Sequence, residues 1–270
     1  MSMNLNLTSY LARIGYSGPL NADLATLAAL QESHANAIPF ESLDPLLKRP
    51  VRLDLESLQA KLVDQRRGGY CFEQNTLFRA ALDTIGFKTT GLTGRVTWMS
   101  PPDAPLGPRE HMLIRVDLPE GPYIADVGFG ACVMDAPLAL KPEVEQSTKM
   151  GTFKISESGG RYEMQAMQPA GWRAAYVFDL EPQIHADFEL GNWYTSTSPG
   201  VVFANVLIIE KVGGGKRHKL INRNYLVEGR DGEVMEHHEI SSADMFAATL
   251  RDHFGLDLPA PADEVFNRLG

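Results

Sequence analysis

The order of the predicted elements indicates an α+β protein in which helices and strands occupy separate blocks. Apolar residues recur at helical spacing up to about residue 86, a strand-like pattern follows, and the chain returns to helix after residue 242. Alternating βαβ units would instead interleave the two patterns along the chain. With 270 residues, 44% hydrophobic and 22% charged, the composition is that of a soluble globular protein with a sizeable core.

Four helices are predicted in the first block. Each combines apolar residues at helical spacing with a capping residue at its start or a glycine at its end. The helices begin at Thr8, Asn21, Asp54 and Cys71, and glycines 15, 69 and 86 end the first, third and fourth. Pro39 and Pro45 predict an irregular stretch between the second and third helices.

The second block is rich in β-branched and aromatic residues, with runs separated by Pro and Gly. A turn at 119–122 joins the alternating segment 111–118 to the short apolar run 123–127, which predicts an antiparallel hairpin. Further strands are predicted at 89–99, on both sides of 158–160, at 172–180, at 201–212 and at 219–227. Other signals predict a Pro-rich loop at 100–110, a Gly turn at 213–215, and helices at 243–254 and 261–269.

Charge and cysteine content exclude several classes of protein. Lys and Arg number 25 against 34 Asp and Glu, a net charge of −9, whereas nucleic-acid-binding domains are usually basic. No run approaches the ~18 apolar residues of a membrane helix, and the first residues lack the pattern of a secretory signal. Two cysteines cannot form a disulfide-rich scaffold. We therefore expect a cytoplasmic protein with reduced thiols and no nucleic-acid or membrane partner.

Cys71 has a chemically distinctive context, because it follows Gly68 and Gly69 closely and opens a predicted helix. The free N–H groups and the dipole at a helix N-terminus favour an anion, here a thiolate. The same N–H groups could stabilise an oxyanion during acyl transfer. The alternative is a buried structural cysteine, which is a common fate of a free thiol. Cys132 lacks this context and is expected to pack in the core.

His111 and Asp126 are the candidate partners of this thiol. His111 opens a predicted strand directly after the Pro-rich loop, where catalytic groups are often held on a rigid frame. Asp126 ends the other strand of the predicted hairpin, so the two side chains can meet and the carboxylate would gain a partner in its apolar run. The alternatives are a surface position for His111 and a turn-capping role for Asp126.

These residues lie in segments that resemble the arylamine N-acetyltransferase family. The sequence R-G-G-Y-C-F-E-Q-N at 67–75 contains the complete family signature R-G-G-x-C-x-E-x-N. Other matching segments are I-P-F-E-S-L at 38–43, G-R-V at 94–96, H-M at 111–112, D-V-G-F-G at 126–130 and S-T-S-P at 196–199. The resemblance therefore extends to about residue 199, and the remainder is much less diagnostic.

The resemblance implies three domains around a Cys-His-Asp core similar to that of cysteine proteases. These are an N-terminal helical bundle at 1–86, a central β-barrel-like domain at 87–195 and a C-terminal α/β lid at 196–270. The bundle would carry the catalytic cysteine, and the barrel would carry the histidine and the aspartate.

The resemblance also implies the activity. Family members transfer acetyl from acetyl-CoA to arylamines, arylhydrazines and hydrazides, by a ping-pong route through an acetyl-cysteine. Cys71, His111 and Asp126 would form the triad, and Phe129 would line the acceptor pocket. Acetyl-CoA would be a co-substrate, with no permanently bound cofactor.

The remaining residues of the signature are expected to support the site. Arg67 and Glu73 flank the nucleophile, and a structural ion pair that anchors the Gly-Gly turn is favoured over a direct catalytic role. Asn75 follows Cys71 by about one helical turn and either supports the site or caps a neighbouring loop.

Substrate contacts are expected from aromatic residues and glycines. An aromatic wall suits a flat arylamine, although ordinary core packing is the alternative for Phe129. Phe40 and Phe203 are further candidates for the pocket. Gly128 and Gly130 form a short turn whose backbone N–H groups could meet the pyrophosphate of CoA.

Two clusters near the C-terminus invite other interpretations. The run at 216–219 is basic, and a solvated hairpin tip is favoured over a surface that attracts anionic CoA; it comprises Lys216, Arg217, His218 and Lys219. His237 and His238 are adjacent in a predicted extended segment, so they point to opposite faces, and no metal site is predicted.

Two other functions compete with acetyl transfer. A cysteine hydrolase of the papain type, or a transglutaminase-like enzyme, uses the same order of Cys, His and Asp or Asn, but peptidases lack the context at 67–75. A catalytically silent binding protein on the same fold is the second alternative. The reactivity of the Cys71 thiol separates this alternative from an enzyme.

Overall fold

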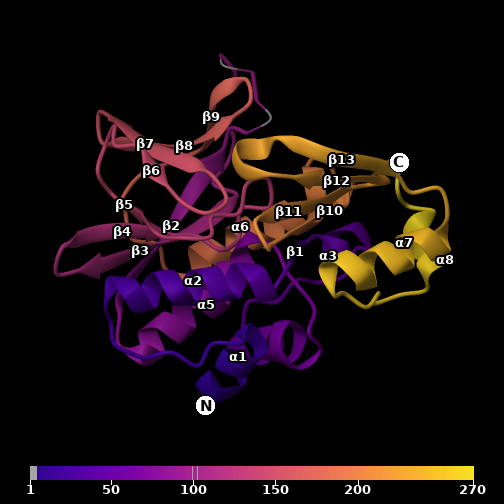
Figure 1. The fold of residues 1–270 in the computed structure, drawn as a ribbon, viewed down its shortest axis with the longest axis horizontal. Helices are drawn as coiled ribbons and strands as arrows, with labels where there is room; N and C mark the ends of the chain where they lie inside the picture. Colours follow the sequence, from indigo (N-terminus) through magenta and orange to yellow (C-terminus); the bar gives the residue numbers. More distant parts are fainter. Residues whose placement is uncertain (1–4, 99, 102) are drawn as a thin grey trace.

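The computed structural model describes residues 5–98, 100–101 and 103–270 and arranges them as helices around two antiparallel sheets (Figure 1). Met99, at the end of a predicted strand, and Pro102, in the predicted loop, lie outside the described residues. The first four residues, which entered the search for a signal peptide, also lie outside them. The predicted α+β class, with helices and strands in separate blocks, is confirmed.

The first block is helical, but two of the predicted caps are wrong. Asn6 and Asp23 accept the first free N–H groups in place of Thr8 and Asn21, whereas Asp54 caps its helix as predicted. The helices are α1 (Leu7–Ile14), α2 (Leu24–Ala37), α3 (Leu43–Leu46), α4 (Leu55–Leu58) with a π-helical continuation (Gln59–Asp64), and α5 (Cys71–Ile85). The predicted irregular stretch holds α3 and a short strand, β1 (Phe40–Glu41).

The central sheet is 8-stranded, with the order β5-β4-β3-β2-β9-β8-β7-β6. Its strands are β2 (Lys88–Val96), β3 (His111–Leu118), β4 (Gly121–Ala125), β5 (Leu138–Ala139), β6 (Gln146–Ser147), β7 (Thr152–Ser158), β8 (Arg161–Gln168) and β9 (Gly171–Phe178). The Gln146 side chain in β6 accepts from the backbone N–H of Ala139 in β5 (2.7 Å) and donates to its carbonyl (2.9 Å). This bridge joins the two edge strands, so the sheet is almost closed into a barrel.

The second sheet is 5-stranded, with the order β1-β10-β11-β12-β13. Its remaining strands are β10 (Ile208–Gly213), β11 (Lys216–Ile221), β12 (Asn224–Glu228) and β13 (Val234–Glu239). The strand predicted at 201–212 is wrong in its first half, where a 3-10 turn (Val202–Ala204) forms. The strand predicted at 219–227 is two strands, because the chain turns at Asn222, whose φ is 50°.

A longer helix that the sequence did not predict is α6 (His185–Thr197). Its exposed face carries large apolar side chains, so the chain shows no amphipathic pattern there; they are Leu190, Trp193 and Tyr194, and Ile184 before the helix is also exposed. The last helices form close to their predicted positions, as α7 (Ala243–Thr249) with a π-helical continuation (Leu250–Phe254) and α8 (Ala262–Phe266).

The helices of the first block contact both sheets (Figure 1). Helix α5 packs against β2 and β3, and α2 packs against β10. The second sheet shares an apolar core with α7 and α8, while the first helices share one with β3 and β4. No helix in the described residues is both long and apolar enough to cross a membrane.

Candidate active site

Cys71 is the first residue of α5, as the sequence predicts. Tyr70 precedes it in an extended conformation, and the Glu73 carboxylate accepts from the Tyr70 N–H at 3.1 Å, which fixes the start of the helix. The thiol is 3% exposed, and its Sγ lies 3.6 Å from the backbone carbonyl oxygen of Glu110. The sulfur therefore lies at the positive end of a 15-residue helix, where negative charge is stabilised.

His111 and Asp126 meet across the predicted hairpin. Strands β3 and β4 pair with Ile114 opposite Ala125, and this register brings the first residue of β3 beside the residue after β4. His111 Nε2 lies 2.7 Å from Asp126 Oδ2, and both side chains are buried. This bond leaves Nδ1 as the ring nitrogen that Asp126 does not occupy.

The electrostatics of this pair favour a charged imidazolium. Burial alone would lower the pKa of His111, but the Asp126 carboxylate, together with a hydrogen bond to Cys71, raises it to about 10. Burial would in turn raise the pKa of Asp126, and the charge of His111 holds it below its usual value. The structure thus brings Cys71, His111 and Asp126 together.

Three further groups hold the Asp126 carboxylate. Oδ1 accepts from Asn75 Nδ2 at 2.9 Å and from the Gly128 N–H at 2.8 Å, and Oδ2 also accepts from the Tyr176 hydroxyl at 3.0 Å. Asn75 also donates to the Met112 carbonyl at 2.7 Å. Asn75 therefore ties the catalytic helix to β3 and to Asp126, and fits the expected supporting role.

Tyr176 was missed by the sequence analysis. It lies in β9, two strands away from β3 in the sheet, and its ring packs tilted against that of His111 with centroids 4.6 Å apart. Nothing in its local sequence distinguishes it from other strand aromatics, because only the sheet order places β9 close enough to the hairpin for this contact.

Two groups of aromatic rings lie at the site. Phe129 packs edge-on against His111 with ring centroids 5.2 Å apart, and against Trp98 at 6.0 Å. Phe40 and Phe203 pack together at 5.7 Å in the apolar cluster that contains Cys71, and Phe203 also contacts the ring of Tyr70, the residue before the nucleophile, at 5.8 Å. Trp98 was not anticipated from the sequence.

The two glycines expected to contact CoA lie against the catalytic helix and its neighbours. A Cβ at Gly128 would lie 2.6 Å from Cys71 Cα, and one at Gly130 would lie 2.3 Å from the ring of Phe40, so close approach requires glycine. The Gly128 N–H donates to Asp126, and it is therefore not a free donor for a pyrophosphate. The expected contact to Gly130 stays a prediction.

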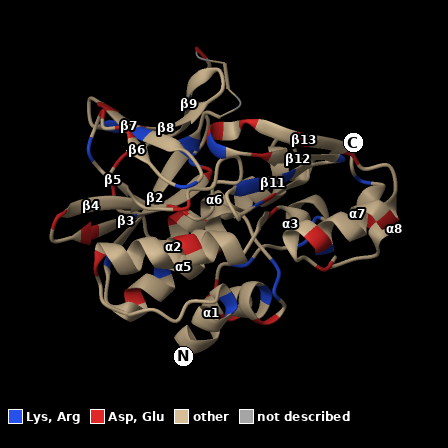
Figure 2. Ribbon diagram, in the orientation of Figure 1, with Lys and Arg blue, Asp and Glu red and all other residues tan. Residues whose placement is uncertain are grey.

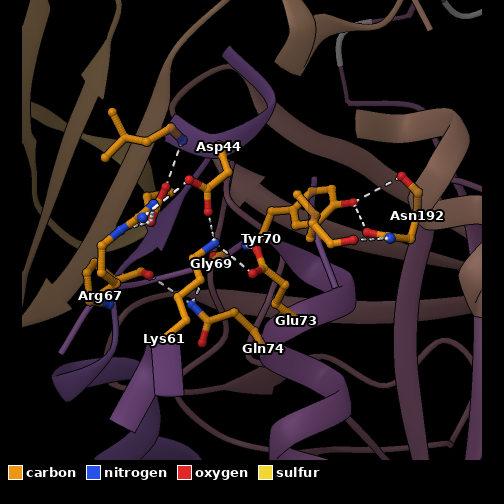
Figure 3. Close-up of polar contacts among 12 residues, drawn as sticks. Asp44, Lys61, Arg67, Gly69, Tyr70, Glu73, Gln74 and Asn192 are labelled. Atoms are coloured by element: carbon orange, nitrogen blue, oxygen red, sulfur yellow. Dashed lines mark hydrogen bonds and ion pairs between the residues drawn. The ribbon is translucent and has the colours of Figure 1, made fainter. Parts of the chain in front are cut away.

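Arg67 and Glu73 are not a direct ion pair, which corrects the expectation (Figure 3). Arg67 binds Glu41 at 2.5 Å and Asp44 at 3.2 Å, whereas Glu73 binds Lys61 at 2.6 Å. Lys61 also binds Asp44 at 2.6 Å and so links the two halves. Segments distant in sequence supply these partners, and their network fixes the Gly-Gly turn that precedes Cys71.

The basic run at 216–219 is neither a solvated tip nor a basic surface. Its residues form β11, and the hairpin turn lies before them at 214–215 (Figure 2). Arg217 is 1% exposed and Lys219 is 9% exposed, and both pair with Glu210 and Glu228. Strand alternation turns both side chains into the interior, where acidic partners balance their charge.

The predicted packing of Cys132 and the predicted opposite faces of His237 and His238 are confirmed. Cys132 is buried in an apolar cluster with Phe129 and Trp98, as expected. His237 hydrogen bonds to Asn224 while its neighbour His238 stacks on Tyr225, in line with opposite faces.

Among the described residues, no group of three or more His, Cys, Asp or Glu side chains is placed to hold a metal ion.

Comparison with known proteins identifies close relatives. A family model described as N-acetyltransferase matches residues 23–263. The arylamine N-acetyltransferase of Mycolicibacterium smegmatis is 40% identical over 259 residues, covering 95% of this chain and 94% of the relative. That of Escherichia coli is 36% identical, covering 93% and 88%.

Solved structures give the same result. The M. smegmatis arylamine N-acetyltransferase superposes with a TM-score of 0.92 and 38% identity, covering 98% of this chain and 97% of the other. The Mycobacterium marinum enzyme in complex with CoA superposes with a TM-score of 0.93 and 36% identity, covering 98% of each chain.

Proposed function

The chain belongs to the arylamine N-acetyltransferase family, and we propose that it transfers acetyl from acetyl-CoA to the nitrogen of arylamines, arylhydrazines or hydrazides. One observation carries this proposal: Cys71, at the N-terminus of α5, lies beside the buried side chain of His111. His111 is bound to Asp126, and its pKa is about 10. Such a pair provides a thiolate and a proton carrier in one place.

The first half-reaction acetylates the enzyme. The Cys71 thiolate attacks the carbonyl carbon of acetyl-CoA, and the first N–H groups of α5 stabilise the oxyanion. The bond from carbon to the CoA sulfur breaks, and the leaving thiolate takes the His111 proton. Asp126 accepts from Nε2, so Nδ1 is the nitrogen that serves the reaction.

The second half-reaction transfers the acetyl group. The unprotonated amine nitrogen of the acceptor attacks the acetyl-cysteine, and His111 takes a proton from that nitrogen. The carbon–sulfur bond to Cys71 then breaks, which restores the thiolate and the imidazolium. Asp126 orients the ring and stabilises its charge throughout.

The substrate contacts are proposals of the same kind. We assign the acceptor pocket to Phe129, Phe40 and Phe203, whose rings flank the reacting thiol and suit a flat aromatic amine. Gly130 remains a candidate contact for CoA. Arg67, Glu73 and Asn75 act as structural support in this assignment.

The domain boundaries, the cellular location and the absence of other partners are also proposals. We retain the division into a helical bundle at 1–86, a barrel-like domain at 87–195 and a lid at 196–270, although β1 of the first segment pairs with β10 of the last. A cytoplasmic enzyme with reduced thiols, no permanently bound cofactor and no nucleic-acid partner fits the composition.

Mass spectrometry tests the function. Incubation with acetyl-CoA should add one acetyl group to Cys71, and an aromatic amine should remove it as the acetylated amine. A stable unmodified protein, or discharge to water at the same rate without amine, would contradict acetyl transfer. Discharge to water without amine would favour the hypothesis of a cysteine hydrolase, which the comparisons do not support.

A further inference from the structure

The loop at 127–137 carries Phe129 from the end of β4 to β5. Within it, the backbone bond from the Cys132 N–H to the Phe129 carbonyl (3.1 Å) supplies a single local turn. The position of the loop therefore depends on bonds from other parts of the chain. Asn75 of α5 accepts from the Val127 N–H at 3.1 Å at the start of the loop, and further bonds come from α2 and from the second sheet.

Gln31 of α2 binds the chain just before this loop and again inside it. Its Nε2 donates to the Asp126 carbonyl at 3.3 Å and to the Met134 carbonyl at 3.1 Å. The second sheet binds Val133, the residue directly before Met134. Glu210 Oε1 accepts from the Val133 N–H at 2.9 Å, and Arg217 Nη2 donates to the Val133 carbonyl at 3.1 Å.

The guanidinium of Arg217 serves several partners at once. Nη1 lies 3.4 Å from Cys132 Sγ, and Nε lies 3.1 Å from Glu210 Oε1. Arg217 and Glu210 are fully buried, so neither charge is compensated by water. Lys219 and Glu228, 2.8 Å apart, complete a quartet with two positive and two negative groups. The planar guanidinium of Arg217 presents a fork of several N–H donors in a fixed geometry, so one side chain binds both the loop and a carboxylate.

We propose that Arg217 is a positioning residue for the aromatic wall of the acceptor pocket, acting on Phe129 through its hold on Val133. Phe129 lies four residues before Val133 and packs on His111 at 5.2 Å. A shift of the loop therefore moves the ring that a flat acceptor contacts. Val133 also belongs to a buried cluster with Val212 of β10, so apolar packing adds to the contact between the loop and the second sheet.

The inference rests on the proposed acetyl transfer and makes a selective prediction. Arg217→Lys keeps the buried positive charge but loses the fork. The KM of an aromatic amine, at saturating acetyl-CoA, should rise about 10-fold to about 100-fold. The KM of a small aliphatic hydrazide, which has no ring to contact Phe129, should stay within about twofold. Arg251→Lys, at an exposed position, is the matched control and should change neither value.

Hydrogen exchange gives a readout that needs no activity. In Arg217→Lys, amides of the loop at 127–137 should exchange faster, while those of α2 and α5 keep the wild-type rates. If the lysine variant fails to fold, the double variant Arg217→Met with Glu210→Gln removes both charges together and leaves the Lys219–Glu228 pair balanced. The same two readouts then apply to it.

The outcomes separate this inference from the proposed function. An equal rise of KM for both acceptors, or unchanged exchange of the loop, would overturn the positioning role. Failure of the wild-type protein to acetylate either acceptor would instead overturn the proposed function, and the exchange experiment would still test the hold of Arg217 on the loop.

Discussion

The two cysteines are almost equally buried, at 3% for Cys71 and 4% for Cys132, and yet their surroundings differ. Cys71 opens a helix and faces His111, which can hold and return a proton. Cys132 lies in a loop beside Arg217, and a guanidinium stays protonated in proteins, so it cannot accept a proton from the thiol. Burial raises the pKa of Cys132, with Arg217 only opposing it. A thiol is therefore a candidate nucleophile because of the side chain beside it, and not because of its own exposure to solvent.

The sharpest test of this contrast replaces the sulfur of Cys71. Cys71→Ser should lower turnover by about 10⁵-fold or more, because the hydroxyl is not ionised by His111. The measurement is CoA release with an aromatic amine, together with the mass of the protein after incubation with acetyl-CoA. Near-normal turnover of this variant would remove Cys71 as the nucleophile.

The second test removes the negative charge behind His111. Asp126→Asn should lower kcat/KM by about 10² to 10⁴-fold, since the imidazolium loses its partner and the ring its fixed orientation. Steady-state kinetics at saturating acetyl-CoA measure the change. A loss of less than about threefold would show that Asp126 fills a turn-capping role through Gly128 alone.

The same variant should change the pH dependence of stability. The pKa of His111 is about 10 in the folded protein, whereas the ordinary pKa of a histidine is 6.5. Because the folded pKa is the higher one, this stabilisation is complete below pH 6.5 and is lost as the pH rises through 10. The wild-type free energy of unfolding in urea should fall across this range, and Asp126→Asn should flatten the fall. Parallel curves would contradict the coupling.

The next test removes the arginine from the charged cluster that supports the turn before Cys71. Arg67→Met leaves Glu41 and Asp44 without their arginine and should lower the free energy of unfolding by about 3–5 kcal/mol. Arg67→Lys should lose less, because it keeps the charge. Urea unfolding at pH 7 measures both. Equal losses would mean that the fork of hydrogen bonds, rather than the charge, supports this turn.

The smallest effect is expected at the second thiol. Cys132→Ala should keep at least about half of the wild-type kcat/KM, because Val133 retains its bonds to Glu210 and Arg217, and should cost about 1 kcal/mol of stability. Kinetics and urea unfolding measure the two quantities. A loss of activity comparable to that of Cys71→Ser would erase the contrast between the two cysteines.

Much of the fold and the centre of the site could be predicted because their signals are local. The start of α5 at Cys71 follows from glycines and helical periodicity within a few residues, and the hairpin that joins His111 to Asp126 follows from alternation and a turn. Helix α6 was missed because its outward face exposes Leu190 and Trp193, which hides the usual pattern.

Two of the wrong predictions concern charges, in β11 and at Arg67. A run of four basic residues predicts a solvated turn when read alone, but alternate side chains of β11 meet Glu210 and Glu228 in the interior. Arg67 likewise finds Glu41 and Asp44, more than 20 residues earlier, instead of the nearby Glu73. In each case, the partner lies on another element.

The sequence by itself determined the α+β class, the helix that presents Cys71 and the strand pair that joins His111 to Asp126. Hydrogen bonding and side-chain periodicity within an element depend on neighbours a few residues apart, so the chain encodes them directly. Only the tertiary structure decided that Tyr176 binds Asp126 and that Arg217 holds the loop of Phe129. These contacts depend on the order of strands in each sheet and on the burial of charges, which arise only when distant segments pack together.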